Sequence, residues 1–386
     1  MCWATRSVRL ALRSAVGGAG DLSSSKVAHQ SWGRHAWVNG EQVTMKAAVF
    51  FSSKDVHLED LPEPRIGHGE LLVRVAGVGL CGSDIDKILC EAVPPGTVLG
   101  HEIVGTVAGV GGGVEDFHIG ERIAVAHHVS CQSCHYCDRG SDSKCSLFLS
   151  TNLYPGGFAE LVRVPEPNVR LAAFSIPDDV TYEQAVFTEP LGCCVRAIER
   201  SRLTPGDTIL IVGAGSIGLL LAQLAKLQDV KVLVSDLLPD RLDMARSFGV
   251  DIALNPMTDL FEGAVREVTS GRGVDTVIST MASQAVLEQA LSLVRDGGLI
   301  HFFAGKRGGL KANMDLNELY EREVGLITTY SSSPRALREA FRLIVEREIR
   351  AEGLVSHHVP LSEVMKGVRL MAGQEARKVF IDVQSG

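Results

Sequence analysis

The sequence lacks any uninterrupted apolar run that approaches the about 18 residues needed to cross a lipid bilayer. It also lacks an excess of positive charge, since 46 Asp and Glu residues outnumber 38 Lys and Arg residues and the formal net charge is -8. The first absence argues against a membrane-spanning protein. The second argues against nucleic acid or an anionic membrane as the main partner. The chain shows neither an internal repeat nor a clean secretory signal.

Aromatic residues are also scarce, at 5% of the chain, whereas glycine is abundant at 40 residues. This combination suits tight β-turns and loops in which the backbone approaches a phosphate closely. At 386 residues the chain is long enough for two domains with separate cores. Its content of 45% apolar and 22% charged residues is ordinary for a globular protein.

Residues 1–44 differ in composition from the rest of the chain. They are rich in basic, small and polar residues, with only Asp21 and Glu41 as acids. An organellar transit peptide has such a composition, but no amphipathic helix is evident here. We favour a disordered extension before a natural start at Met45, where MKAAVFF opens a strand-like run. Nine cysteines, four of them clustered, leave an odd remainder that fits a reducing compartment, so we expect a cytoplasmic protein.

In the remaining chain, the pattern of apolar residues changes between about Thr181 and Pro190. Before this point, short apolar runs separated by Gly, Pro and Asp predict a β-rich domain over residues 45–190. Beyond it, buried-strand runs alternate with helical patterns, which predicts a doubly wound parallel sheet over residues 191–327. A helix and a strand within residues 328–386 are expected to return to the first domain. The predicted fold class is therefore α/β, with a β-rich domain beside a Rossmann parallel-sheet domain.

Four cysteines form the most specific motif of the chain, with the spacing C-x2-C-x2-C-x7-C: Cys131, Cys134, Cys137 and Cys145. Thiolates clustered this tightly favour a tetrahedral zinc site, with each sulfur about 2.3 Å from the metal. Disulfides are disfavoured, because cysteines three residues apart make strained bridges. Four protein ligands leave no position for water or substrate. The motif therefore predicts a structural zinc, and it carries no chemistry of its own.

A glycine-rich turn follows the buried-strand run TILIV and precedes an apolar helical pattern. Gly213, Gly215 and Gly218 form G-x-G-x-x-G. The first glycine allows a tight turn, the second lets the backbone approach a pyrophosphate, and the third permits close packing of the helix on the strand. Ser216 and Ile217 open the helix, whose N-terminal N–H groups and positive dipole end favour phosphate. The turn therefore predicts a dinucleotide site.

Asp236 closes the next buried-strand run, VKVLVSD. A carboxylate at this position accepts hydrogen bonds from both ribose hydroxyls and repels a 2′-phosphate, which predicts NAD rather than NADP. Arg241 is the other residue that we expect at the cofactor. A cation there would soften the preference for NAD.

A second metal site is predicted in the β-rich domain. Cys81 in the run CGSD and the pair His101 and Glu102 in the run GHE both follow strand-like segments. A Cys, a His and a carboxylate together suit an open zinc site. Glu189 in the run TEPLG is a candidate fourth ligand or close neighbour. Taken singly, each residue has an ordinary alternative: a small buried hydrophobe, a satisfied core histidine or a solvated charge.

In this order along the chain, the motifs resemble those of the zinc-dependent medium-chain dehydrogenase family, and in particular its sorbitol and polyol branch. Gly100 to Glu102, then Gly105 and Gly111 through Val114, match every position of the family's zinc signature G-H-E-x2-G-x5-G-x2-V. The cysteine quartet resembles its structural-zinc lobe, and GAGSIG resembles its NAD site. The resemblance runs from about Met45 to the C-terminus. It implies a GroES-like catalytic domain, two zinc ions per chain, NAD, and a homo-oligomer (tetramer or dimer).

Position by position, the resemblance implies that Cys81, His101 and Glu102 ligate a catalytic zinc and that Ser83 relays the substrate's proton. Glu189 stands where alcohol dehydrogenases have a third cysteine and where the polyol branch has glutamate. The resemblance leaves open whether Glu189 or water is the fourth ligand.

Two positions depart from the family pattern, one at the proton relay and one near the substrate. Asp86 stands where alcohol dehydrogenases often have a histidine that completes the proton relay. Thr328, Thr329 and Tyr330 stand where sorbitol dehydrogenases usually show an Arg-Tyr pair, which puts sorbitol itself in doubt.

We therefore expect zinc- and NAD-dependent oxidation of a secondary alcohol to the ketone, in a small polyol, cyclitol or sugar-like substrate. One alternative is an amino-alcohol substrate of the L-threonine type, which Glu189 disfavours. Another is an NAD-binding regulator that has lost catalysis, which the complete set of ligand residues disfavours. A quinone reductase-like relative fits less well, because those proteins lack both metal sites.

Overall fold

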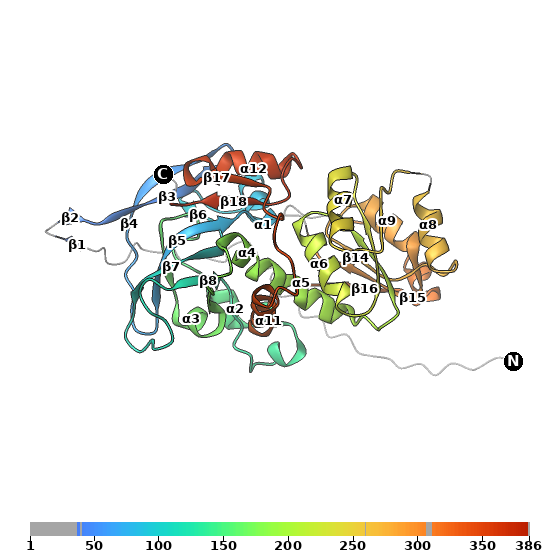
Figure 1. The fold of residues 1–386 in the computed structure, drawn as a ribbon, viewed down its shortest axis with the longest axis horizontal. Helices are drawn as coiled ribbons and strands as arrows, with labels where there is room; N and C mark the ends of the chain where they lie inside the picture. Colours follow the sequence, from blue (N-terminus) through green and yellow to red (C-terminus); the bar gives the residue numbers. More distant parts are fainter. Residues whose placement is uncertain (1–36, 39–40, 259, 306–310, 385–386) are drawn as a thin grey trace, which may run out of the picture. The chain divides into compact units, whose positions relative to one another are not determined.

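The computed structural model describes residues 37–38, 41–258, 260–305 and 311–384 (Figure 1). The disordered extension expected for residues 1–44 lies mostly outside these residues, so that expectation stays untested. Every described element, from β1 (Trp37–Val38) onward, belongs to one compact unit. In this described part of the chain, no helix is both long and apolar enough to cross a membrane.

The larger sheet of the β-rich part has seven strands in the order β10-β8-β7-β5-β18-β17, with β9 also paired to β5. Its neighbours are antiparallel except for β17 and β18. A smaller sheet has the order β4-β3-β6, and β1 pairs with β2. The strands are β2 (Glu41–Gln42), β3 (Thr44–Ser52), β4 (Asp55–Pro62), β5 (Leu71–Gly79), β6 (Thr97–Val98), β7 (Glu102–Val110), β8 (Arg122–Ala126), β9 (Leu161–Val164), β10 (Ala173–Ser175), β17 (His357–Pro360) and β18 (Val379–Asp382).

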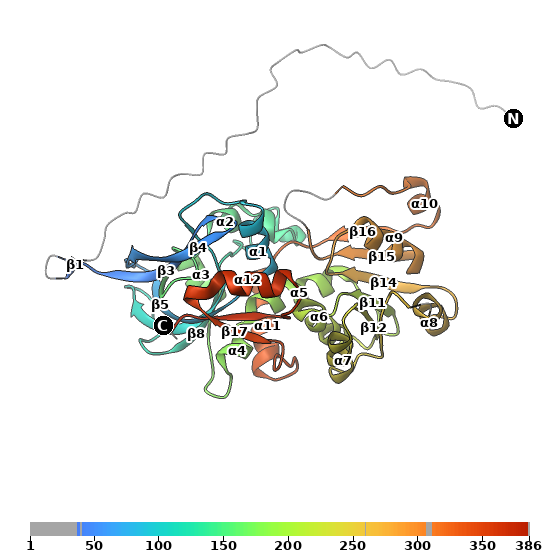
Figure 2. The same cartoon turned by 90° about the horizontal axis from the view of Figure 1, so that it is seen from above.

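Short helices connect these strands. They are α1 (Gly82–Leu89), η1 (Cys137–Arg139), η2 (Asp142–Lys144), α2 (Ser146–Ser150), α3 (Glu166–Ala172), α4 (Tyr182–Ala185), η3 (Leu361–Glu363) and α12 (Val364–Ala372). Figure 2 shows α12 lying along β17. Val364 and Val368 of α12 belong to the same buried cluster as Val359 of β17 and Val379 of β18. The segment from β17 to β18 is thus part of the β-rich core.

The other part is a six-stranded parallel sheet in the order β13-β12-β11-β14-β15-β16. The strands alternate with helices, which confirms the doubly wound parallel sheet predicted from the sequence. The elements are β11 (Thr208–Val212), α6 (Ser216–Lys226), β12 (Lys231–Ser235), α7 (Pro239–Ser247), β13 (Ile252–Leu254), α8 (Phe261–Val268), β14 (Val274–Ser279), α9 (Gln284–Leu293), β15 (Val294–Phe302), α10 (Leu316–Glu321) and β16 (Gly325–Thr328).

The central strand β11 is buried on both faces, as its continuous apolar run predicts. Ile209 and Ile211 belong to the cluster that includes residues of α6 and α7, whereas Leu210 and Val212 belong to the cluster of α8 and α9. Because successive side chains of a strand point to opposite faces, the two sets of helices cover opposite faces of the sheet (Figure 1).

Helix α5 (Thr188–Ser201) packs against β7 and β8, against α6 of the parallel-sheet part, and against α11 (Pro334–Val345). Its Ala197 shares one buried cluster with Leu343 of α11, Val104 of β7 and Ile209 of β11. The domain boundary expected at residue 190 falls within the first turn of α5. Pro190 is tolerated there, because the first turn of a helix has no intrahelical acceptor for its N–H groups. The exact boundaries therefore stay an expectation.

His301 on β15 is fully buried and uses both ring nitrogens. Its Nδ1 lies 2.8 Å from Ser201 Oγ at the end of α5. Its Nε2 lies 2.8 Å from Thr329 Oγ1, just after β16. Burial lowers the pKa of His301 to about 4, so that the imidazole is neutral near pH 7. This histidine therefore joins α5 to the edge of the parallel sheet.

The first prediction concerns the glycine turn. A Cβ added at Gly218 would overlap the backbone carbonyl oxygen of Gly213. Gly218→Ala should therefore lower the free energy of unfolding by about 1–3 kcal/mol, measured by urea denaturation. Gly215→Ala is the matched control, since Gly215 has a φ of -68° and no atom lies within 4 Å of an added Cβ. Equal stability of the two variants would contradict the steric explanation.

The second prediction concerns pH. The pKa of His301 is about 4 in the folded protein and 6.5 ordinarily, so the unfolded chain takes up this proton first as the pH falls. The stability from neutral His301 should be complete above pH 6.5 and be lost towards pH 4, a loss of roughly 3 kcal/mol. Urea denaturation between pH 7 and pH 4.5 measures it. His301→Gln should show a shallower pH dependence, and equal slopes would count against this assignment.

Candidate active site

Cys81 is fixed at the N-terminus of α1. It is the N-cap residue of this helix, and its Sγ accepts a hydrogen bond from the backbone N–H of Ser83 at 3.5 Å. In return, the carboxylate of Asp84 accepts one from the backbone N–H of Cys81 at 3.4 Å. This reciprocal cap satisfies two helix-end donors and holds the Cys81 sulfur in place.

His101 and Glu102 lie at the start of β7, and both are buried. The Nδ1 atom of His101 lies 3.2 Å from Oδ1 of the fully buried Asp84. A carboxylate on one ring nitrogen orients a histidine and leaves the other nitrogen to bind a metal. Asp84 therefore belongs to the site, although the sequence analysis did not select it. Its position in the run CGSD was the available signal.

The ligand atoms of Cys81, His101 and Glu102 lie within 4.8 Å of one another. The structure therefore brings together the three residues that the sequence analysis chose. A thiolate, an imidazole and a carboxylate suit zinc by their chemistry, and three protein ligands leave a coordination position open. The residues present thus fit the metal, and their role as ligands stays a prediction.

Glu189 is buried in the first turn of α5 and lies outside that close group. Its Oε1 accepts a hydrogen bond from the Cys193 thiol at 3.5 Å. Burial, and then the Glu189 charge, raise the pKa of Cys193 well above its ordinary value, so this thiol stays protonated and can donate. Burial raises the pKa of Glu102, and the charge of Glu189 adds to this rise. The position of Glu189 suits a neighbour of the metal group, and its role as fourth ligand stays a prediction.

Lys378, which directly precedes β18, is a second residue that the sequence analysis missed. It is buried and forms an ion pair with Glu102 Oε2. Burial opposes its charge, but the Glu102 carboxylate and the Cys81 sulfur outweigh burial and raise the pKa of Lys378. Gly79 makes room for the pair, because an added Cβ would lie 2.9 Å from Lys378 Cε and would collide with Glu102. No local motif marks this lysine, since it meets Glu102 only through the fold.

His127 and His128 follow β8 and were also missed. The ring centroid of His127 lies 4.5 Å from that of His101 and 4.0 Å from that of His128. The buried Asn168 holds the backbone of this segment by donating to the carbonyl of His127 at 3.0 Å. Burial is the main cause that lowers the pKa of His128 to about 4 and of His127 well below its ordinary value. The neutral imidazole of His127 therefore lies beside the metal group, and the neutral imidazole of His128 lies behind it against His127.

The cysteine quartet also comes together. The ligand atoms of Cys131, Cys134, Cys137 and Cys145 lie within 4.8 Å of one another. Sγ of Cys137 is 3.5 Å from that of Cys134 and 3.9 Å from that of Cys131. Four sulfur atoms at such separations fit a closed tetrahedral zinc site and are too far apart for disulfides. Hydrogen bonds from Ser133 lower the pKa of Cys131 to about 6, which favours the thiolate that a metal requires.

The glycine turn has the geometry of a phosphate-binding loop. Gly213 has a φ of 97°, in the left-handed region that favours glycine, and Gly215 is the N-cap residue of α6. Ser216 and Ile217 form the first turn of α6, as predicted. The N-terminus of this eleven-residue helix faces the end of β11, where phosphate is favoured.

Asp236 lies at the end of β12, beside the glycine turn. Its Oδ2 accepts a hydrogen bond from the N–H of Ala214 at 2.7 Å, and its Oδ1 accepts one from Leu238 at 3.0 Å. Arg241 lies 3.7 Å from Asp236 Oδ2 and also donates to the carbonyl of Gln374 at 3.1 Å. The carboxylate and the cation thus sit together, and the NAD preference stays a prediction.

Two of the residues that differ from the family pattern, Thr329 and Tyr330, have hydrogen-bond partners within the protein. Thr329 is buried against His301, as described above, and the carbonyl of Tyr330 accepts a hydrogen bond from Arg196 at 2.7 Å. The ring of Tyr330 is 63% exposed and lies 5.6 Å from Lys144 Nζ. This segment therefore supports the edge of the parallel sheet.

An open metal group of mixed ligands and a glycine turn on a parallel sheet define a class of protein: the metal- and dinucleotide-dependent dehydrogenases. Family models agree. Residues 67–177 match the alcohol dehydrogenase GroES-like domain, and residues 216–346 match the zinc-binding dehydrogenase domain. The chain is 36% identical to the sorbitol dehydrogenase of Bacillus subtilis (strain 168) over 262 residues, which cover 66% of this chain and 73% of that protein. The chain belongs to the zinc-dependent medium-chain dehydrogenase family.

Other relatives have different substrates in their names. The chain is 29% identical to the L-threonine 3-dehydrogenase of Chelativorans sp. (strain BNC1), over 88% of this chain and 98% of that protein. Among solved structures, a protein described as a zinc-binding dehydrogenase from Sinorhizobium meliloti 1021, bound to NADP, superposes with a TM-score of 0.79 at 28% identity. That match covers 89% of this chain and 100% of the other. The expected fold and family are thus confirmed, whereas the substrate is not decided.

The third prediction concerns the buried ion pair at the site. Lys378→Met should leave the Glu102 carboxylate buried without its cation, which costs about 3–5 kcal/mol of the free energy of unfolding. Lys46→Met is the matched control, because it removes an exposed pair with Asp60 that is worth about 1 kcal/mol or less. Urea denaturation of the two variants measures the difference. Equal losses would show that the Glu102 pair does not stabilise the fold.

Proposed function

We propose that this dehydrogenase oxidises a secondary alcohol of a polyol, cyclitol or sugar-like substrate to the ketone, with NAD as the hydride acceptor. The observation that carries the proposal is the convergence of Cys81, His101 and Glu102 within 4.8 Å, in a chain of this family. Glu189, buried nearby, supports the polyol branch through its match to the glutamate of that branch.

The residues have distinct roles in this proposal. Cys81, His101 and Glu102 would hold the catalytic zinc, which when bound acts as a Lewis acid and lowers the pKa of a substrate hydroxyl. Asp84 orients His101 through its Oδ1 atom, which lies 3.2 Å from Nδ1 of the imidazole. Lys378 balances the charge of Glu102 within the buried site. The hydroxyl of Ser83, at the first turn of α1, would accept the proton that leaves the substrate.

The cofactor supplies the redox chemistry, because nicotinamide takes the hydride from the alcohol carbon. The protein holds it through Gly213, Gly215 and the first turn of α6. Asp236 supports NAD, since its carboxylate would meet a 2′-phosphate with like charge. Arg241 lies close enough to weaken that preference. Assays with both NAD and NADP therefore belong to any test.

The neighbouring histidines favour a substrate with several hydroxyl groups. Neutral imidazoles both donate and accept hydrogen bonds, and His127 lies against the His101 ring. An apolar wall would suit a simple alcohol better. An amino-alcohol substrate of the L-threonine type is the second candidate, favoured by the relative named above. For the same protein we propose a structural zinc at the cysteine quartet, a homo-oligomer and a cytoplasmic location.

The fourth prediction tests this function. The purified protein should bind two zinc ions and reduce NAD with at least one member of a panel of polyols, inositols and L-threonine. Cys81→Ala should retain one zinc ion and its fold, but lose at least about a thousandfold in activity, because the open metal site is gone. Cys90→Ala, at an exposed position that caps the opposite end of the same helix, should keep both ions and the activity.

Three results would contradict the proposal. A single zinc ion in the wild-type protein would favour an NAD-binding regulator that has lost catalysis. Activity with L-threonine alone would favour the second candidate. Full activity of Cys81→Ala with its zinc retained would remove Cys81 from the site.

A further inference from the structure

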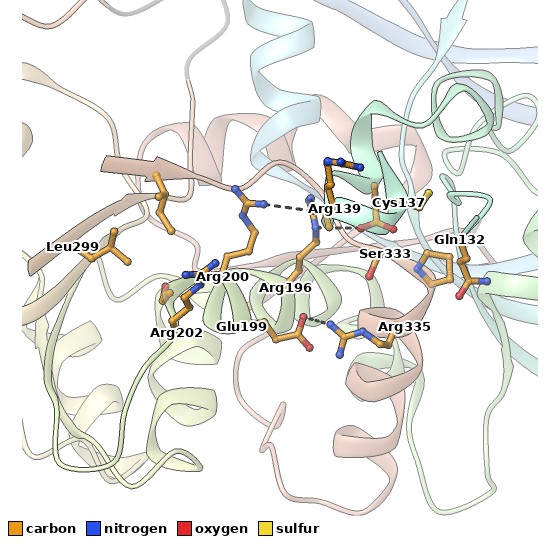
Figure 3. A pocket seen from close by; sticks show the side chains of 15 residues that line it. Gln132, Cys137, Arg139, Arg196, Glu199, Arg200, Arg202, Leu299, Ser333 and Arg335 are labelled. Carbon is orange, nitrogen blue, oxygen red and sulfur yellow. Dashed lines mark hydrogen bonds and ion pairs between the residues drawn. The ribbon is translucent and has the colours of Figure 1, made fainter. Parts of the chain in front are cut away.

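A cavity of about 730 Å³ has a charged lining in which arginine dominates. Cys137 of the cysteine quartet is the one expected metal ligand among its lining residues. Its walls come from η1, the end of α5, the strands β15 and β16, and the start of α11 (Figure 3). The charged side chains that line it are five arginines and two acids: Arg139, Arg196, Arg200, Arg202, Arg335, Asp142 and Glu199. The lining therefore carries a surplus of positive charge, since arginine stays protonated in proteins.

Two of the five arginines are already committed to the protein. Arg196 donates to the carbonyl groups of Tyr330 and Gly140, both at 2.7 Å, and lies 3.9 Å from Asp142. Arg335 forms an ion pair with Glu199, which Figure 3 shows along one wall of the cavity. Both acids of the lining are thus used by these two arginines.

The other three guanidinium groups have no carboxylate partner within the described residues. Arg139 contacts His135 at 3.2 Å, and Arg200 donates to the carbonyl of Gly140 at a long 3.4 Å. The Nε of Arg200 is buried and has no hydrogen-bond partner in the described structure. Arg202 is the C-cap residue of α5 and is exposed. Three cations without counterions on one cavity repel one another, and a bound anion would reduce this repulsion.

The chemistry of guanidinium selects the kind of anion. Its planar fork of N–H donors matches the oxygen atoms of a phosphate, which accepts two parallel hydrogen bonds. The cavity volume is within the range of about 300–1,000 Å³ that small-molecule sites occupy. We propose that this cavity binds a small phosphate-bearing molecule through Arg139, Arg200 and Arg202. Both carboxylates of the lining, Asp142 and Glu199, are paired with other arginines and do not oppose it.

Two other charges act on the same cavity. Cys137 lines it, and a zinc ion held by four thiolates carries a net charge of about -2, which offsets part of the arginine surplus. The C-terminal end of α5 adds negative partial charge, whereas the N-terminal end of α11, at Ser333 and Pro334, adds positive partial charge. These helix ends oppose one another. The competing explanation is therefore that the arginines only neutralise the thiolates.

A bound phosphate would have a structural effect as well. Arg139 belongs to the cysteine lobe, whereas Arg200 and Arg202 belong to the end of α5. One anion held by all three would join these segments, and a ligand that binds only the folded state raises the melting temperature.

The fifth prediction tests the site on the zinc-loaded protein, with NADH at saturation so that the glycine turn is filled. Inorganic phosphate and glycerol 3-phosphate are titrated by calorimetry and by thermal unfolding. We expect binding and a rise in melting temperature for wild type. The variant Arg200→Gln/Arg202→Gln should bind at least about tenfold more weakly, from the loss of two charge-assisted contacts. Arg170→Gln, at an exposed arginine on α3, is the control for a lost surface charge.

The outcomes separate the explanations. Tighter binding of the ester than of inorganic phosphate supports a phosphorylated metabolite, and equal binding supports the free ion at the same site. Loss of zinc from the double variant, with no anion binding by wild type, would mean that the arginines serve the thiolates and would overturn the proposal. Equal binding by wild type and the double variant would overturn it as well.

Discussion

The buried ion pair between Glu102 and Lys378 is the contact on which the arrangement of the metal group depends. Glu102 begins β7, and Lys378 directly precedes β18, so the pair joins residues 276 positions apart in sequence. Between them, β5 pairs with both β7 and β18, and Gly79 at its end leaves the space that the two side chains fill. A carboxylate buried here without a cation would be too costly to remain ionised. The C-terminal segment therefore completes the site from the far end of the chain.

The metal-group residues themselves could be predicted because their signals are local. Cys81 caps its own helix, and His101 and Glu102 are adjacent in a recognisable signature, so a short window of sequence contains each one. The glycine turn is local for the same reason: steric overlap at Gly218 and a positive φ at Gly213 demand glycine whatever the rest of the fold does. The parallel sheet follows from alternating patterns of similarly short range. A short window of sequence is therefore informative where a residue's environment is made by its neighbours.

Lys378 and His127 could not be selected in this way, and Asp84 was not selected although it lies in the run CGSD. Each acquires its role from a partner brought close by the fold: His101 for Asp84, Glu102 for Lys378, and the His101 ring for His127. Read alone, a lysine near the C-terminus is an ordinary surface residue. The same limit applies to the arginine cavity, whose five cations come from three separate segments. Only the tertiary structure shows that they face one space.

Helix α5 connects the chemistry of one site with the charge of the other. Its first turn carries Glu189 beside the metal group, and its last turn carries Arg200 and Arg202 on the cavity. The helix packs against β7, β8, α6 and α11, and close-packed interiors transmit small shifts. A phosphate held at its C-terminal end would restrain the element that positions Glu189. Any coupling between binding at the cavity and turnover at the metal group would have to pass through this helix of fourteen residues.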